Sequence, residues 1–189
     1  MSAKRNPLLG VVRLARGKVD GLAQFGDTPQ SFLASLAPLV AFSLVGAGLL
    51  AGRAGLGAVL GLLLLLVVAH LAPPVLSHAL ARYWDREDWW LRYATAYNWV
   101  QCALPLAVLP LAVGMQAAAM LGVPAGTVVQ LGIVLFVGYA LWLQWLLARH
   151  GLDLSRGRAA VVVGLVHTGT YMLALGPARV VSWFTGTGA

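Results

Sequence analysis

The amino-acid sequence predicts an all-α fold, a polytopic transmembrane helix bundle of about five spans with a cytoplasmic N-terminus. Composition is the first indication: of 189 residues, 60% are hydrophobic and only 10% are charged, and the mean hydropathy is +0.82. Soluble domains carry about 25% charged residues, and one of this size has too little interior to hide so many apolar side chains. The length of the apolar runs and the placement of basic residues are the other two indications.

Five apolar runs are long enough to cross a bilayer, which takes about 20 residues of helix. Residues that interrupt helices separate them: Pro29 precedes the first run, Pro124 lies between the third and fourth, and Gly157 precedes the fifth. The predicted spans are residues 32–52, 56–80, 94–121, 125–148 and 160–183.

Basic residues are distributed unevenly between the two sides of these spans. Eleven of the thirteen lysines and arginines lie on the side of the N-terminus, and only Arg53 and Arg179 lie on the other side. Because Lys and Arg are enriched in cytoplasmic loops, we expect the N-terminus to be cytoplasmic. This placement explains the net charge of +7. No basic patch with interleaved stacking residues lies outside the spans, so nucleic-acid binding is not expected.

The location that the sequence predicts is the inner (cytoplasmic) membrane of a bacterium. Ala, Gly, Leu and Arg dominate and lysine occurs only at Lys4 and Lys18, a bias typical of GC-rich bacterial genomes. The first apolar run begins near residue 32 and is longer than the 7–15 residues of a secretory signal. We therefore expect it to be retained as a span, with a cleaved signal and four remaining spans as the alternative.

The N-terminal part, residues 1–29, is predicted to be a cytoplasmic amphipathic segment, ahead of a membrane domain at residues 30–184 and a short outer tail at residues 185–189. Within residues 7–25, apolar side chains recur on one face at helical spacing, opposite polar ones such as Arg13. This pattern predicts a helix that lies on anionic lipid headgroups. A plain orientation tag on a flexible tether is the equally favoured alternative.

The loop between the second and third spans, ARYWDREDWWLRY at residues 81–93, alternates charges with aromatic rings. One interpretation is an interfacial anchor, because Trp and Tyr favour the headgroup level of a membrane. The other is a docking surface for a cytoplasmic protein or a lipid headgroup. The candidate docking residues are Trp84, Arg86, Trp89, Trp90 and Arg92.

Five polar side chains fall in the cytoplasmic half of the predicted spans when depth is counted at ~1.5 Å per residue. They are His70, Asn98, Gln101, Gln144 and His167. Such groups turn inward to find partners. They predict either hydrogen bonds between helices, at ~0.6 kcal/mol each, or a polar cavity open to the cytoplasm in which the two histidines contact a ligand.

Enzymatic, metal and redox chemistry are not expected. The single cysteine, Cys102, excludes an intramolecular disulfide and a cysteine-based metal cluster. No HExxH motif and no nucleophile constellation is visible, so no catalytic residue, metal site or cofactor is predicted. No Asp or Glu lies within a predicted span, which argues against a pump that relies on a buried carboxylate. Prolines instead predict helix kinks, at Pro73 and Pro74 in the second span and at Pro105 and Pro110 in the third.

Two short patterns resemble those of small bacterial membrane proteins related to the Yip (Ypt-interacting protein) family. They are SFLASLAP at residues 31–38, at the start of the first span, and YATAYNWVQ at residues 93–101, after the charged aromatic loop. The resemblance implies a five-span membrane protein. In eukaryotes the family is associated with vesicle traffic and Rab-type GTPase binding. This sequence has no DLYGP-like motif at its second span, so neither GTPase binding nor any catalytic residue is carried over.

The function that these features favour is a non-enzymatic, Yip-like protein that organises membranes or binds a partner. Its partners would be the bilayer, with anionic headgroups on the cytoplasmic side, and a protein or a second copy of the chain. One alternative is a small transporter or channel component that uses the polar cluster, although an odd number of spans and the lack of a visible repeat count against it. The other is an accessory subunit of a larger membrane complex.

Overall fold

The computed structural model describes residues 5–51 and 55–185, and over these residues the chain forms helices and turns without a β-strand. The predicted all-α class is therefore confirmed. Two of the elements, labelled η, are 3₁₀-helices. In chain order the elements are α1 (Pro7–Ala15), η1 (Val19–Gln24), α2 (Pro29–Ala51), α3 (Leu56–Tyr83), α4 (Glu87–Ala103), η2 (Leu104–Ala107), α5 (Val108–Met120), α6 (Ala125–Gly151) and α7 (Arg156–Thr185).

Four helical stretches are long and apolar enough to cross a membrane, which makes the chain compatible with a membrane protein. They are Pro29–Leu49, Gly57–Tyr83, Glu87–Met120 and Ala125–Gly151, the third comprising α4, η2 and α5. The fifth predicted span falls within α7, which is not among these four. Of the two basic residues assigned to the far side of the membrane, Arg53 lies outside the described residues.

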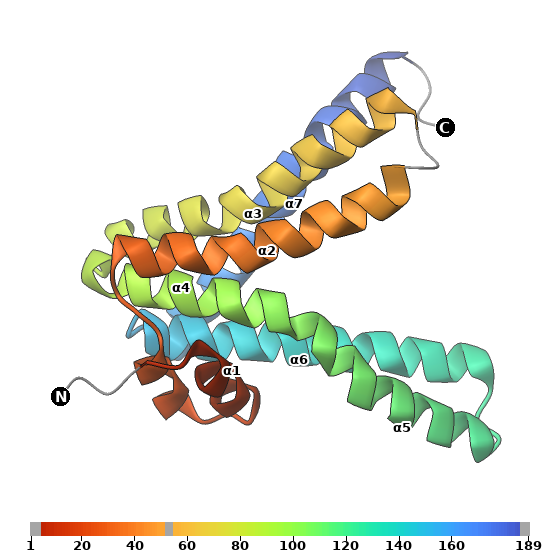
Figure 1. Ribbon diagram of the computed structural model, residues 1–189, viewed down its shortest axis with the longest axis horizontal. Coiled ribbons are helices and arrows are strands. Elements are labelled where there is room, and N and C mark those ends of the chain that lie inside the picture. Colours follow the sequence, from red (N-terminus) through yellow and green to blue (C-terminus); the bar gives the residue numbers. More distant parts are fainter. Residues whose placement is uncertain (1–4, 52–54, 186–189) are drawn as a thin grey trace.

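The helices form two arms that diverge from a shared base (Figure 1). At the base α4 contacts α2, α3, α6 and the N-terminal elements. One arm consists of α2, α3 and α7, and the other of α5 and α6. Residues Tyr93 to Asn98 of α4 are all buried, and the small side chains of Ala94 and Ala96 among them allow neighbouring helices to approach closely.

The third span breaks at Pro105, one of the two prolines predicted to kink it, whereas Pro110 lies inside the helix α5. After Ala103 the chain continues for four residues as the 3₁₀-helix η2, which includes Pro105, before α5 begins at Val108. Proline lacks the N–H that an α-helix needs and clashes with the preceding turn. In α3, by contrast, Pro73 and Pro74 lie inside one uninterrupted helix, whose two halves run in different directions in Figure 1.

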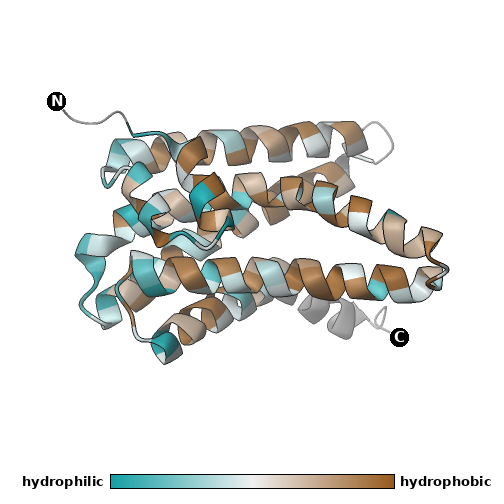
Figure 2. Ribbon diagram, turned by 90° about the horizontal axis from the view of Figure 1, so that it is seen from below, coloured by the Kyte–Doolittle hydropathy of each residue, from teal (hydrophilic) through white to brown (hydrophobic). Residues whose placement is uncertain are grey.

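Polar side chains and the buried core are found at the same end of the molecule. Hydrophilic residues gather at the end of the helices near the N-terminus, and the far ends are mainly hydrophobic (Figure 2). The core there joins Leu14 of α1, Phe25, Leu147 of α6 and Val162 of α7, all of them fully buried. Along the arms most large apolar side chains are exposed, as expected where lipid is the solvent.

The segment at residues 7–25 is not the single amphipathic helix that its periodicity predicts. It forms a hairpin of α1 and η1, called the N-terminal hairpin below, and the chain reverses at Gly17, whose φ is +74°. The side chain of Asn6 caps α1 by accepting hydrogen bonds from the N–H groups of Leu8 and Leu9, at 3.1 and 3.3 Å. The apolar face is divided as a result, with Leu22 buried in the core and Leu8 66% exposed.

The two elements of this hairpin, α1 and η1, meet at glycines, which gives a test of its packing. A Cβ on Gly21 would lie 2.7 Å from the carbonyl oxygen of Gly10, so we expect Gly21→Ala to cost about 1–3 kcal/mol through overpacking. Tryptic cleavage after Arg13 and Arg16 in detergent should become at least about fivefold faster. Gly46→Ala, where nothing lies within 4 Å of the new Cβ, is the matched control. Equal cleavage rates for the two variants would contradict the packing described here.

Candidate functional site

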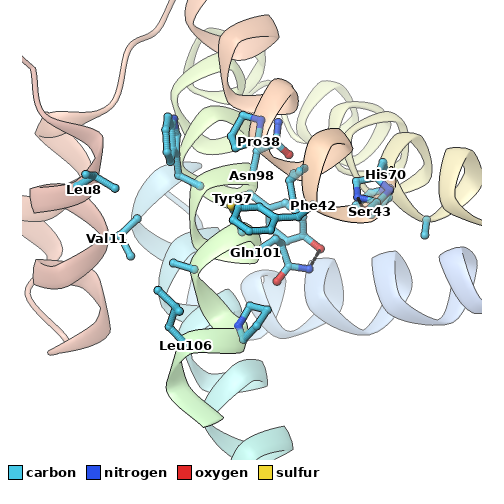
Figure 3. Close-up of a pocket in the computed structure, with 17 residues that line it drawn as sticks. Leu8, Val11, Pro38, Phe42, Ser43, His70, Tyr97, Asn98, Gln101 and Leu106 are labelled. Atoms are coloured by element: carbon cyan, nitrogen blue, oxygen red, sulfur yellow. Dashed lines mark hydrogen bonds between the residues drawn. The ribbon is translucent and has the colours of Figure 1, made fainter. Parts of the chain in front are cut away.

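A cavity of about 680 Å³ lies at the base, where the two arms separate (Figure 3). Its volume falls in the range of small-molecule sites, about 300–1,000 Å³. Leu8 and Val11 of α1 close one side, and the remaining wall comes from α2, α3, α4 and η2. Side chains that can form hydrogen bonds make up part of this wall, and we call it the polar-walled cavity. These side chains are Ser43, His70, Tyr97, Asn98, Trp99, Gln101 and Cys102.

His70 and Ser43 form a closed pair between α3 and α2. The Nδ1 atom of His70 lies 2.6 Å from the carbonyl oxygen of Leu66, and its Nε2 atom lies 3.0 Å from the hydroxyl of Ser43. A carbonyl only accepts, so Nδ1 carries a proton and donates it. In the neutral ring Nε2 then accepts the hydrogen bond that Ser43 donates. Both ring nitrogens are satisfied, so the pair links the two helices.

Asn98 connects α4 to α2 in a similar way. It is 1% exposed, and its amide nitrogen donates to the hydroxyl of Ser35 at 2.9 Å. Ser35 in turn donates to the carbonyl oxygen of Phe32 at 2.6 Å. Burying an amide without a partner costs several kcal/mol, so this chain of hydrogen bonds is what allows Asn98 to lie in the core.

Gln101 links the cavity to α6. Its amide nitrogen donates to the hydroxyl oxygen of Tyr97 at 3.2 Å, and its amide oxygen accepts from the amide nitrogen of Gln144 at 3.4 Å. Gln144 is 5% exposed and lies behind the wall rather than in it. The three side chains form one network in which every member is neutral.

Four of the five polar residues that the sequence singles out are thus brought together. His70, Asn98 and Gln101 line the cavity and Gln144 supports it from behind. His167 does not line it, and its Nδ1 atom donates to the carbonyl oxygen of Val163 in its own helix, at 2.8 Å. The predicted hydrogen bonds between helices are present for these four residues, and three of them, His70, Asn98 and Gln101, also line the cavity.

Other wall residues were not expected from the sequence. Ser43 and Tyr97 resemble any other serine or tyrosine in a span, and only the partner on the facing helix distinguishes them. Leu8 and Val11 reach the cavity because α1 ends at Ala15 and the N-terminal hairpin folds against α4. A single helix over residues 7–25 would not place them there.

An apolar groove of about 470 Å³ lies beside the cavity, between α2 and α3. It shares Ser43 and His70 with the cavity, and the rest of its lining consists of leucines and valines only. The groove therefore offers a surface for any hydrocarbon chain. The polar-walled cavity differs from it in the amides and hydroxyls of α4.

Most of the candidate docking residues have partners within the molecule. The Nε1 atom of Trp90 donates to the hydroxyl of Ser77 at 3.1 Å, and its ring lies 4.6 Å from that of His78. The guanidinium of Arg86 lies 3.8 Å from Asp153. Arg92 pairs with Asp27, and Arg158 lies 5.8 Å from the ring of Trp84. Of the five, Trp89 is the exposed one, at 42%.

Asp27 holds the start of the chain against α4 through two ion pairs, called the charge clamp below. Its carboxylate lies 2.9 Å from Nη1 of Arg5 and 2.6 Å from Nη2 of Arg92. The hydrogen bonds from Arg5 and then from Arg92 hold the pKa of Asp27 well below its usual value of 3.8. Exposed ion pairs contribute only about 0.2–1 kcal/mol, whereas burying Leu14 and Phe25 contributes about 1.5–3 kcal/mol each. Apolar contacts therefore dominate the docking of the N-terminal hairpin.

The chemistry that the cavity offers is neutral hydrogen bonding next to apolar surface. Among the residues that the structure describes, no Asp, Glu, Lys or Arg lines it. Over the part of the chain that the structure describes, no three His, Cys, Asp or Glu side chains come together in a way that would hold a metal ion. The arrangement suits a molecule with one polar, uncharged end.

No protein-family model matches this sequence, and no curated protein and no solved structure is significantly similar to it.

Breaking the charge clamp should loosen the N-terminal hairpin without releasing it. We expect Asp27→Asn to raise tryptic cleavage after Arg13 about fivefold, the effect of about 1 kcal/mol. Asp20→Asn is the matched control for a lost ion pair, because it removes the Arg13–Asp20 pair within the hairpin, at 2.8 Å. Its effect is measured by cleavage after Arg16. An equal change in both variants would show that the clamp does not hold the hairpin against α4.

The clamp also has a predictable pH dependence. A carboxylate whose pKa is lowered by folding contributes stability above its unfolded value and loses it as the pH falls through the folded value. The protection of the amides of residues 7–24 from hydrogen exchange should therefore stay constant between pH 8 and 5 and decline below about pH 4. Hydrogen exchange measured by mass spectrometry over this pH range, corrected for the intrinsic exchange rate, tests it. A decline between pH 7 and 6 would point to a different titrating group.

Proposed function

We propose that this protein is a non-enzymatic integral membrane protein with five spans and a cytoplasmic N-terminus, and that it binds an amphipathic molecule in the polar-walled cavity. Four helical stretches already have the length and hydropathy of spans. The fifth span would be α7, whose 30 residues extend about 45 Å, more than the ~30 Å of a hydrocarbon core. The basic residues of the sequence support the cytoplasmic N-terminus.

The observation that carries the binding proposal is the composition and opening of the cavity. Phe42 and Leu106 line it and are nevertheless 71% and 64% exposed. The cavity therefore opens between the arms, at the level of apolar side chains. A molecule dissolved in the bilayer reaches such an opening directly, with its chain against Phe42 and its polar end toward Asn98 and Gln101.

A membrane-organising role of Yip-like type fits this proposal, because a protein that holds a particular lipid changes the composition of the bilayer around it. The N-terminal hairpin supports the same reading. Leu8, Leu9 and Val12 are exposed on it together with the cations Arg16 and Lys18. Exposed apolar and basic side chains on one small unit favour contact with an anionic membrane surface.

The number of spans is tested with tags at the two ends of the chain. With five spans, an N-terminal tag is accessible to a membrane-impermeant reagent only from the cytoplasm, and a C-terminal tag only from outside. If α7 does not cross, both tags are accessible from the same side. Intact and permeabilised cells of the expression host give the two readings.

The binding proposal is tested by filling the cavity. Ala69 lines it, and we expect Ala69→Phe to lower the amount of lipid that remains bound after purification in mild detergent, measured by native mass spectrometry. Ala117→Phe, at an exposed position of α5 away from the cavity, is the matched control. Equal lipid retention in the wild type and in both variants would overturn the proposal.

A further inference from the structure

We infer that the amphipathic molecule has an uncharged head that carries hydroxyl and ester or other carbonyl groups, as diacylglycerol does, rather than a phosphate. This inference rests on the proposed binding function and specifies its ligand. It follows from three features of the cavity: the absence of charge in its wall, the hydrogen-bonding capacity left over in that wall, and the contrast with the neighbouring apolar groove.

Within the described ranges 5–51 and 55–185, no charged side chain in the wall would match a charged head. Its lining residues there include no Lys or Arg, and its polar members are a serine, a tyrosine, a histidine, a tryptophan, a cysteine and two amides. An ionised phosphate placed there would lose its hydration without gaining a cation, which is very unfavourable away from water. The arginines of the charge clamp, Arg5 and Arg92, pair with Asp27 and do not line the cavity.

Hydrogen-bonding capacity remains on α4. Tyr97 accepts a hydrogen bond from Gln101, and its own O–H donates to none of the described residues. Asn98 donates to Ser35, and its amide oxygen accepts no hydrogen bond from them. The wall thus offers a hydroxyl donor and an amide acceptor one residue apart. His70 and Ser43 satisfy each other and Leu66, so they have little capacity left. A head with a hydroxyl to donate and a carbonyl to accept matches Asn98 and Tyr97.

The contrast with the apolar groove assigns the selection to the head rather than to the chains. Apart from Ser43 and His70, which satisfy each other, leucines and valines line that groove, so any acyl chain fits it equally well. Leu39, Phe42 and Leu106 offer the same kind of surface in the polar-walled cavity. Lipids that share their chains and differ in their heads should therefore differ only in how they occupy the polar-walled cavity.

Cys102 reports that occupancy, because it is the only cysteine of the chain and it lines the cavity. The experiment follows its alkylation by N-ethylmaleimide in phosphatidylcholine vesicles that contain dioleoylglycerol, dioleoyl phosphatidate or dioleoyl phosphatidylglycerol. We expect dioleoylglycerol to slow alkylation at a mole fraction at least about tenfold lower than either anionic lipid, because the anionic heads lack a counter-charge in the wall. The control carries Cys102→Ser and Val113→Cys. Val113 is 71% exposed on α5, so this thiol should react equally fast in all three mixtures.

The outcomes separate this inference from the function on which it rests. Equal or stronger protection by the anionic lipids overturns the uncharged head but leaves binding in place. No protection by any lipid, with Cys102 reactive throughout, overturns the binding proposal itself. Slower reaction at position 113 as well would show that the lipid acts on the bilayer and not on the cavity, which also overturns the inference.

A variant pair tests the wall directly. Tyr97→Phe removes the hydroxyl, whose O–H donates to none of the described residues and whose oxygen accepts from Gln101, and it keeps the ring. We expect half-protection of Cys102 to need about fivefold more dioleoylglycerol, the effect of one hydrogen bond to the lipid. Gln116→Leu also removes a polar group from the same span, at an exposed position that does not line the cavity. It should leave the requirement unchanged. An unchanged requirement in Tyr97→Phe would contradict the assignment of the head to α4.

Discussion

The burial of the first half of α4 is the constraint on which the rest of the structure depends. Its residues from Tyr93 to Asn98 are enclosed on all sides, and the N-terminal hairpin, α2, α3 and α6 all contact this helix. Close approach is possible because small residues lie at the contacts: a Cβ on Gly151 of α6 would come within 3.1 Å of the ring of Tyr93. The neighbours that pack around the first half of α4 therefore fix its position and direction.

The break at η2 ends that enclosure. Beyond Ala103 the 3₁₀-helix η2 redirects the chain, and α5 packs against α6 alone among the long helices. The arm of α2, α3 and α7 keeps its own direction (Figure 1). The cavity lies where the enclosed and separated parts of this span meet, which is why Gln101 and Pro105 both line it. It is a consequence of how the third span is built rather than a gap left by imperfect packing.

Hydropathy and proline placement were enough to predict the helical class, the helices themselves and the break in the third span. Hydropathy and proline placement depend only on residues close together in the sequence, so they locate helices and breaks along the chain. The N-terminal hairpin was not predictable in this way, because its reversal depends on the contact of Gly10 with Gly21 and on apolar burial of Phe25 against elements far away in sequence. Propensity alone favours a longer helix there.

The sequence predicted the depth of the candidate-site residues along their helices, but not the direction in which each side chain points. Counting residues along each helix placed five polar groups at one level. In the structure three of them line one cavity, and a fourth, Gln144, bonds to one of these three. His167 was the exception because depth does not say which way a side chain points, and its ring bonds to its own helix. Ser43 was missed for the same reason. Trp90 and Arg92 were predicted as candidate docking residues, and in the structure they have the partners Ser77 and Asp27 within the chain.

Hydrogen bonds between helices and a ligand site are usually weighed as alternatives for polar groups in a membrane helix, but one side chain can serve both. An amide has two donors and an acceptor with two lone pairs, and one hydrogen bond to a facing helix leaves capacity unused. Asn98 uses one N–H to hold Ser35 of α2. That bond fixes the orientation of its remaining amide groups at the wall of the cavity. In the proposed function, a molecule with matching donors and acceptors would use these groups without reorienting them.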